Sequence, residues 1–364
     1  MKYKYPVYQP SLKGNEKKYV NECLDSTWIS SKGKFIEKFE DKFTKYLNVQ
    51  YATSVCNGTT ALHLALITLG IGKGDEVIVP TFTYIASVNV ITYTGATPVF
   101  VDSMRDTWQM DSEDVRRKIT RKTKAIMPVH LYGYICDMDK ICRIAKDNNL
   151  FIIEDAAESF GAKYKEKHSG TFGNIAAFSF FGNKTITTGE GGMIVTNDKT
   201  LFDRAVHFKG QGLAKYREYW HDVVGYNYRM TNICAAIGLA QLERTDEILI
   251  QKKRIVQWYN ENLIDLPIEI QNESDDIVPS YWMYTILVDT PKVRDDLRKH
   301  LTENGIETRP TFYPIHTMPM YCDNYQKHPV AEDIAWRGIN LPSYPDLENK
   351  DIVNISEIIY RYFK

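Results

Sequence analysis

Short apolar runs alternate with segments of helical periodicity as far as Val195. The apolar runs predict strands at 51–55, 76–80, 97–101, 124–130 and 150–155. The segments between them predict helices at 59–67, 86–93, 112–119 and 138–148. Short apolar strands separated by helices are typical of a parallel or mostly parallel sheet that is covered on both faces. The pattern therefore predicts a large α/β domain.

The periodicity changes beyond Val195. One long helical pattern runs over 230–250 and continues over 252–263. Shorter patterns indicate a compact α+β unit, and they lie at 281–288, 293–304, 307–309 and 351–362. We therefore expect two domains, a large one of residues 1–245 that includes the amino-terminal segment, and a smaller α+β one of residues 246–364.

The composition is that of an ordinary globular protein. Hydrophobic residues make up 43% of the 364 residues and charged residues 25%, which excludes a disordered, fibrous or coiled-coil protein. The formal net charge is -1, so no overall positive field favours nucleic acid or an anionic membrane as a partner. Any anionic ligand must be held by a local site.

Three further features bear on location and metal binding. The amino terminus carries charge and lacks the apolar core of a signal peptide, which predicts a cytoplasmic protein. The uncharged stretch 77–101 is long enough to cross a bilayer, but Pro80 and Gly95 divide it, and we interpret it as strand, loop, helix and strand. The six cysteines form no Cys-x-x-Cys pair and no histidines cluster at zinc spacing, so we expect reduced thiols and no metal site.

Ligands of open α/β sheets bind beyond the carboxyl ends of the strands, and two candidate positions follow predicted strands. Gly58, Thr59 and Thr60 begin a helix, where free N–H groups and hydroxyls would hold a phosphate; the alternative is an ordinary helix cap. Asp155 ends an apolar strand, where a partly desolvated carboxylate needs a cation beside it; the alternative is a cap of the next helix. We interpret its neighbour Glu154 as a strand-edge or solvated acid.

Lys184 is the third candidate. Between Lys167 and Lys199 it is the one Lys or Arg, and apolar, Gly and Thr residues surround it. Most lysines are solvated, but a buried lysine has a lowered pKa and can form a Schiff base. Pyridoxal 5'-phosphate requires a lysine for the imine, a carboxylate for the pyridinium nitrogen and a helix N-terminus for the phosphate. Tyr84 would then stack on its ring or, alternatively, pack in the core.

Six segments match the motifs of a single family. They are 57–65, 79–84, 128–133, 154–158, the Lys184 segment with 189–192, and 225–230. In this order they resemble the nucleotide-sugar aminotransferases of the DegT/DnrJ/EryC1/StrS family over nearly the whole chain. The resemblance implies a fold type I, pyridoxal phosphate-dependent aminotransferase with a mostly parallel seven-stranded sheet. It also implies a homodimer in which both subunits build each active site.

The resemblance also assigns roles to residues. Lys184 would form the Schiff base with the cofactor, Asp155 would pair with the pyridine nitrogen, Tyr84 would stack on the ring, and Glu158 would lie near the phenolic oxygen. The remaining cofactor-binding residues would surround the phosphate, and they are Gly58, Thr59, Thr60 and Ser179, with Asn227 and Arg229 reaching the neighbouring subunit. Some relatives carry histidine in place of the lysine and catalyse dehydration, so Lys184 argues for transamination.

Segments 178–198 and 225–243 resemble family members that transfer the amino group of L-glutamate to C4 of GDP-4-keto-6-deoxymannose. The product, GDP-perosamine, would serve O-antigen or other surface polysaccharide. Five residues are candidates for substrate contacts, namely Tyr216, Arg217, Trp220, Arg309 and His316; the alternative for the first three is an exposed loop. Three alternative functions stay open: an aminotransferase for a UDP- or dTDP-linked sugar, a pyridoxal phosphate-dependent sugar dehydratase, and a binding protein without turnover.

Overall fold

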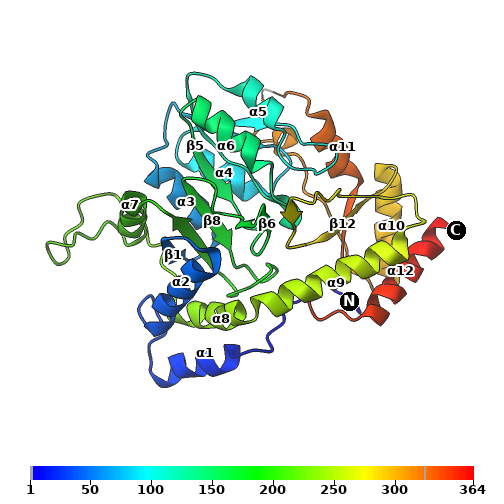
Figure 1. Cartoon of the computed structure of the whole chain (residues 1–364), viewed down its shortest axis with the longest axis horizontal. Helices are drawn as coiled ribbons and strands as arrows, with labels where there is room; N and C mark the ends of the chain where they lie inside the picture. Colours follow the sequence, from blue (N-terminus) through cyan, green and yellow to red (C-terminus); the bar gives the residue numbers. More distant parts are fainter. Residues whose placement is uncertain (1–2, 324) are drawn as a thin grey trace.

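The computed structural model describes residues 3–323 and 325–364 (Figure 1). Its α-helices are α1 (Glu16–Asp25), α2 (Lys34–Leu47), α3 (Gly58–Thr68), α4 (Ile85–Tyr93), α5 (Ser112–Lys118), α6 (Met138–Asp147), α7 (Lys199–Lys209), α8 (Asn232–Glu243), α9 (Thr245–Leu263), α10 (Pro291–Glu303), α11 (Pro329–Arg337) and α12 (Asn349–Phe363). The 3-10 helices are η1 (Leu131–Gly133) and η2 (Ile315–Thr317). Its strands are β1 (Tyr51–Val55), β2 (Glu76–Pro80), β3 (Thr97–Val101), β4 (Thr123–Ile126), β5 (Phe151–Asp155), β6 (Lys163–Tyr164), β7 (Lys167–His168), β8 (Ile175–Ser179), β9 (Gly192–Thr196), β10 (Glu269–Ile270), β11 (Ile277–Val278), β12 (Tyr284–Leu287), β13 (Arg309–Pro310) and β14 (Gly338–Leu341).

A seven-stranded sheet forms the centre of the larger unit. Its strand order is β1-β9-β8-β5-β4-β2-β3. Strand β9 runs antiparallel to both of its neighbours, and the other pairs are parallel. The prediction of a mostly parallel seven-stranded sheet in an α/β fold is therefore confirmed.

Helices cover both faces of this sheet (Figure 1). Successive side chains of each strand point to opposite faces, so apolar side chains on both faces need covering. On one face, Ile153 and Ile194 join a core with apolar residues of α3, α4 and α7. On the other face, Met193 packs with α2 and α8, whereas Ile152 packs with α5 and α6. Glu154 and Asp155 follow the same alternation, so they face opposite sides of the sheet.

A four-stranded antiparallel sheet, β10-β12-β14-β13, organises the smaller unit. Its core joins Ile286 and Ile339 to apolar residues of α9, α10 and α12. Tyr5 is buried in this same core. The structure thus places Tyr5 in the core of the smaller unit, whereas the Tyr8 hydroxyl hydrogen-bonds to Lys184 in the larger one. A domain boundary at residue 245 stays a prediction.

Two predicted elements end differently in the structure. The helical pattern over 230–263 is interrupted at Arg244, whose backbone φ of -110° and ψ of 13° leave the helical range, so α8 and α9 are separate helices. The strand predicted over 124–130 ends at Ile126 because the chain then turns into η1, where Tyr132 has a φ of 56°. His130 consequently lies just after the strand rather than on it.

The uncharged stretch 77–101 folds as predicted, with its apolar residues in β2, α4 and β3. Among the residues that the structure describes, no helix combines the length and the apolar character needed to cross a bilayer.

Candidate active site

Lys184 lies in the loop between β8 and β9 and is largely buried. The backbone N–H of Lys184 donates a hydrogen bond to the carbonyl of Phe181 at 2.9 Å. Its Nζ lies 3.8 Å from Glu158 Oε1 and 3.9 Å from the centroid of the Trp282 indole ring. Burial lowers the pKa of Lys184, and the charges of Glu158 and Asp155 oppose this effect. The amine is therefore held in a confined place between an acid and an aromatic face.

Asp155 is the last residue of β5 and is 3% exposed. Its Oδ2 accepts a hydrogen bond from Ser87 Oγ at 2.7 Å, and its Oδ1 accepts one from the Ala157 N–H at 3.1 Å. Burial raises the pKa of Asp155, whereas these hydrogen bonds and the charge of Lys184 lower it. A cation bound against this carboxylate would favour its ionised form.

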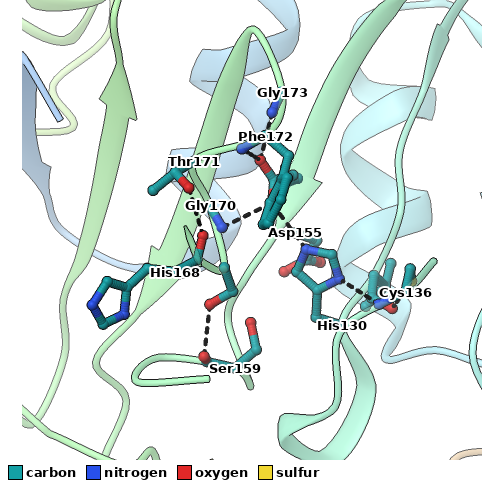
Figure 2. Close-up of polar contacts among 12 residues, drawn as sticks. His130, Cys136, Asp155, Ser159, His168, Gly170, Thr171, Phe172 and Gly173 are labelled. Carbon is teal, nitrogen blue, oxygen red and sulfur yellow. Dashed lines mark hydrogen bonds and ion pairs between the residues drawn. The ribbon is translucent and has the colours of Figure 1, made fainter. Parts of the chain in front are cut away.

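Glu154 is fully buried, so its interpretation as a solvated acid is wrong. Backbone N–H groups of the segment that follows β7 surround its carboxylate. Figure 2 labels the residues of this segment that donate these hydrogen bonds. Gly170 donates to Oε2 at 2.8 Å, and Phe172 and Gly173 donate to Oε1 at 2.7 Å and 2.6 Å. His130 Nε2 lies 3.0 Å from Oε2. Since Cys136 donates its N–H to His130 Nδ1, the ring proton is on Nε2 and donates to Glu154. This network fixes the end of β5 and thereby positions Asp155.

Glu158 follows β5 and is 4% exposed. Its Oε2 accepts a hydrogen bond from the Tyr132 N–H at 2.9 Å, while its Oε1 faces Lys184. Burial raises the pKa of Glu158 to about 7, although the charge of Lys184 acts in the opposite direction. Glu158 is therefore able to bind or release a proton near neutral pH, next to the lysine amine.

The N-terminus of α3 lies against the end of β8. Asn57 caps the helix by accepting the Thr60 N–H at 2.9 Å, and Thr60 Oγ1 donates to the Asn57 carbonyl at 2.8 Å. A Cβ added to Gly58 would lie 2.7 Å from the Ser179 Cβ, so only glycine permits this approach. The structure thus brings Gly58, Thr59, Thr60 and Ser179 together at one helix end, where backbone N–H groups favour an anion.

A row of aromatic rings leads from Tyr84 to the lysine. The Tyr84 ring, at the N-cap of α4, lies 5.6 Å from Phe312. Phe312 stacks on Tyr132 at 5.5 Å, and Tyr132 stacks on Trp282 at 6.1 Å. Trp282 is not predictable as a site residue, because nothing in the strand pattern of 281–288 distinguishes it. Tyr84 itself is 57% exposed, so its ring is accessible to a ligand.

The other predicted residues lie elsewhere in this subunit. Asn227 and Arg229 contact each other at 3.0 Å, next to a loop of residues 211–225 that projects beyond α7 in Figure 1. That loop carries Tyr216, Arg217 and Trp220, and Arg217 lies over the Trp220 ring at 4.6 Å. Arg309 is exposed on β13, 3.9 Å from Glu307. In this chain, no hydrogen bond, ion pair or ring contact joins any of these side chains to Lys184.

His316 is not placed for a substrate contact. The ring is 2% exposed; its Nδ1 lies 2.6 Å from Thr81 Oγ1 and its Nε2 lies 3.2 Å from Glu332 Oε1. Both ring nitrogens therefore have protein partners, and neither is left for a sugar or an amino acid. The fold uses His316 to join η2 to the loop that follows β2.

The residues that converge at this site suit a phosphorylated pyridine aldehyde. A buried lysine amine would bind its carbonyl carbon, a buried carboxylate would face a protonated ring nitrogen, and the α3 N-terminus would hold the phosphate. The Asp155 carboxylate supports this fit, since its burial without a bound cation is unfavourable.

A mostly parallel sheet covered on both faces, with a buried lysine beside a buried strand-end carboxylate, is the arrangement that a pyridoxal phosphate-dependent α/β enzyme requires. The model of the DegT/DnrJ/EryC1/StrS aminotransferase family matches residues 10–360, and the chain belongs to this family.

Several bacteria have a relative that is named GDP-perosamine synthase. That of Escherichia coli O157:H7 is 65% identical over 363 residues, which cover 100% of this chain and 99% of the relative. That of Vibrio cholerae is 50% identical over 362 residues, covering 98% of this chain and 99% of the relative. A structure of Spr1654 from Streptococcus pneumoniae in its PLP form has a TM-score of 0.94 at 28% identity and covers 100% of both chains.

Proposed function

We propose that this protein transfers the amino group of L-glutamate to C4 of GDP-4-keto-6-deoxy-D-mannose and so forms GDP-perosamine. The observation that carries the proposal is the contact of the buried Lys184 amine with Glu158, beside the carboxylate of Asp155. The relatives named GDP-perosamine synthase support the choice of sugar nucleotide, since they match nearly the whole chain.

Pyridoxal phosphate is the cofactor of this proposal, and the PLP-form structure of Spr1654 supports it. When bound, it supplies a carbonyl carbon that accepts an amino group and a ring that takes up electron density. Lys184 would hold this carbon, and Asp155 would hold the protonated ring nitrogen. Gly58, Thr59, Thr60 and Ser179 would bind the phosphate, while Tyr84 would cover the ring.

Lys184 would also move the proton that amino transfer requires. An amine accepts a proton only when it is neutral, and an unperturbed lysine has a pKa of about 10.4. Burial lowers the pKa of Lys184, which increases the neutral fraction near pH 7. Glu158, whose pKa burial raises to about 7, would exchange protons with the amine or with the cofactor oxygen next to it.

The anionic sugar nucleotide needs cations that one subunit does not bring to Lys184. The 211–225 loop carries the exposed side chains of Tyr216, Tyr219 and Val224, which are 74%, 93% and 86% exposed. We infer that this loop and the adjoining Asn227 and Arg229 pack against a second copy of the chain and reach its active site. Size-exclusion chromatography with light scattering tests the dimer, and a monomeric active enzyme would contradict it.

Turnover with glutamate and a panel of GDP-, UDP- and dTDP-linked 4-keto-6-deoxy sugars tests the substrate. We expect the GDP-mannose derivative to have the highest kcat/KM, and preference for a UDP or dTDP sugar would overturn that assignment. Glutamate labelled with ¹⁵N must transfer its label to the sugar, whereas a dehydratase would release an unlabelled product.

Lys184→Ala tests the enzyme itself. We expect loss of the visible absorbance of bound cofactor and a decrease in kcat of about 10³-fold or more. Lys199→Ala, at an exposed lysine paired with Asp203, is the matched control and should retain both properties. A binding protein without turnover would show no activity in either form.

A further inference from the structure

Lys252 on α9 is 1% exposed, and neither the strand and helix pattern nor the proposed chemistry gives it a role. Its Nζ donates hydrogen bonds to the carbonyl of Trp282 at 2.9 Å and to the carbonyl of Ser343 at 2.6 Å. The same nitrogen lies 5.3 Å from the centroid of the Tyr8 ring. Burial lowers the pKa of Lys252 to about 7, because transfer of the charged amine from water to the protein interior is unfavourable.

The two aromatic residues that Lys252 contacts both donate hydrogen bonds to the backbone of the Lys184 loop. Trp282 Nε1 donates to the carbonyl of Asn183 at 2.6 Å, and its indole face lies under Lys184 Nζ. The Tyr8 hydroxyl donates to the carbonyl of Lys184 at 2.7 Å. The buried Lys252 amine thus contacts both Trp282 and Tyr8, the residues whose side chains donate to the consecutive carbonyls of Asn183 and Lys184.

We propose that Lys252 is a positioning residue for Lys184, acting through Trp282 and Tyr8. Its hydrogen bond to the Trp282 carbonyl sets the position of the indole, and the indole sets both the backbone at Asn183 and the place of the Lys184 amine. Because amino transfer needs the amine at a fixed position, loss of Lys252 affects the reaction more than substrate binding. The effect on the reaction rests on the proposed function, whereas the coupling of Lys252 to the position of the Lys184 loop does not.

Three variants test the proposal. Lys252→Met removes the donors, and Lys252→Gln has nearly the shape of methionine but keeps a neutral N–H donor. Tyr259→Phe is the matched control, because the Tyr259 hydroxyl donates from the same helix to the carbonyl of Pro342 at 2.9 Å, next to Ser343. It therefore removes one buried hydrogen bond of the same kind without touching Trp282 or Tyr8.

The first measurement is hydrogen exchange, by mass spectrometry, of peptides covering 181–187 in the cofactor-free protein. We expect exchange about tenfold faster in Lys252→Met, about threefold faster in Lys252→Gln and unchanged in Tyr259→Phe. If the exchange rate of these peptides in Lys252→Met lies within twofold of their rate in Tyr259→Phe, the proposal is overturned. If Lys252→Met does not fold, Lys252→Gln decides, and exchange at the wild-type rate overturns it.

The second measurement is steady-state kinetics with the loaded enzyme. We expect kcat to fall about tenfold in Lys252→Met, while KM for the sugar nucleotide changes by less than about twofold. An increase in KM alone would contradict positioning of the lysine. If the protein does not act on the GDP sugar, hydrogen exchange still decides the coupling, so failure of the proposed function is distinguishable.

Discussion

Glu154 and Asp155 are adjacent carboxylates that β5 directs to opposite faces of the sheet. Glu154 accepts hydrogen bonds from three backbone N–H groups and from His130, whereas Asp155 faces Ser87 and Lys184. One residue thus fixes the strand end and its neighbour presents a charge to the site. Glu154 and Asp155 therefore have separate roles, one in stability and one in the site, and substitution of each by its isosteric amide distinguishes these roles.

Glu154→Gln should destabilise the protein. Whichever way the amide is turned, its NH₂ faces N–H donors where a carboxylate oxygen accepted them. We expect the free energy of unfolding to fall by about 3 kcal/mol, measured by urea denaturation of the cofactor-free protein. Glu166→Gln, at a side chain that is 88% exposed, should change it by less than about 0.5 kcal/mol. Equal effects of the two substitutions would refute the anchoring role of Glu154.

Asp155→Asn should impair the reaction and spare the fold. The amide oxygen can still accept from Ser87 or Ala157, and the unfavourable burial of a charge disappears. We expect kcat to fall about 10²-fold or more, with unfolding free energy equal to or above that of the wild type. Steady-state kinetics and urea denaturation measure the two quantities. A variant with kcat within threefold of the wild type would show that no ionised partner is needed.

Gly58→Ala should push α3 away from β8. The added Cβ would meet the Ser179 Cβ at 2.7 Å, and we expect a loss of about 1–3 kcal/mol in unfolding free energy. Because the clash involves the Ser179 side chain, adding Ser179→Gly to the Gly58→Ala protein should recover part of the lost unfolding free energy. A double-mutant cycle measures this coupling. Gly182→Ala is the control, since its Cβ would meet nothing within 4 Å. A cycle with no coupling would contradict the close approach.

Glu158→Gln should change the pH dependence of stability. The folded-state pKa of Glu158 is about 7, above the ordinary 4.5, so the folded protein binds this proton more tightly than the unfolded chain. The stabilisation by this group is complete below about pH 4.5 and is lost as the pH rises to 7, by up to about 1.4 kcal/mol per pH unit. The difference in unfolding free energy between wild type and variant should therefore fall over this range and then level off.

Urea denaturation of the cofactor-free proteins at a series of pH values measures this difference. Glu190→Gln, at an exposed residue of the lysine loop, provides the matched carboxylate-to-amide control. A difference between wild type and Glu158→Gln that stays constant with pH would contradict the burial of an ionisable Glu158.

Much of the fold follows from periodicity along the sequence. Five of the seven strands of the large sheet, and the helices between them, are visible as apolar runs, because most of these strands are buried by helices on both faces. Strands β8 and β9 are not among the predicted strands. The break between α8 and α9 is not visible, since Arg244 is an ordinary helix former and only its backbone angles interrupt the pattern.

Within the site, Lys184 and Asp155 are conspicuous because their local surroundings are unusual for charged residues. Trp282 and Lys252 are not, since their contacts join segments far apart in the chain. The Trp282 bond to Asn183 spans 99 positions, and the Lys252 bond to Ser343 spans 91. The burial of Glu154 is not predictable for a different reason, because its partners are backbone groups of a nearby loop that carries no sequence signature.

The docking of the first residues on the carboxy-terminal unit sets an order of assembly during synthesis. The Val7 N–H donates to Glu307 at 2.9 Å across 300 positions, so this segment leaves the ribosome long before its partner exists. Tyr8, which supports the Lys184 carbonyl, is the next residue. The large sheet can form while translation continues, but the lysine loop gains this support only after nearly the whole chain has been made. The nascent protein therefore cannot complete its reactive centre early.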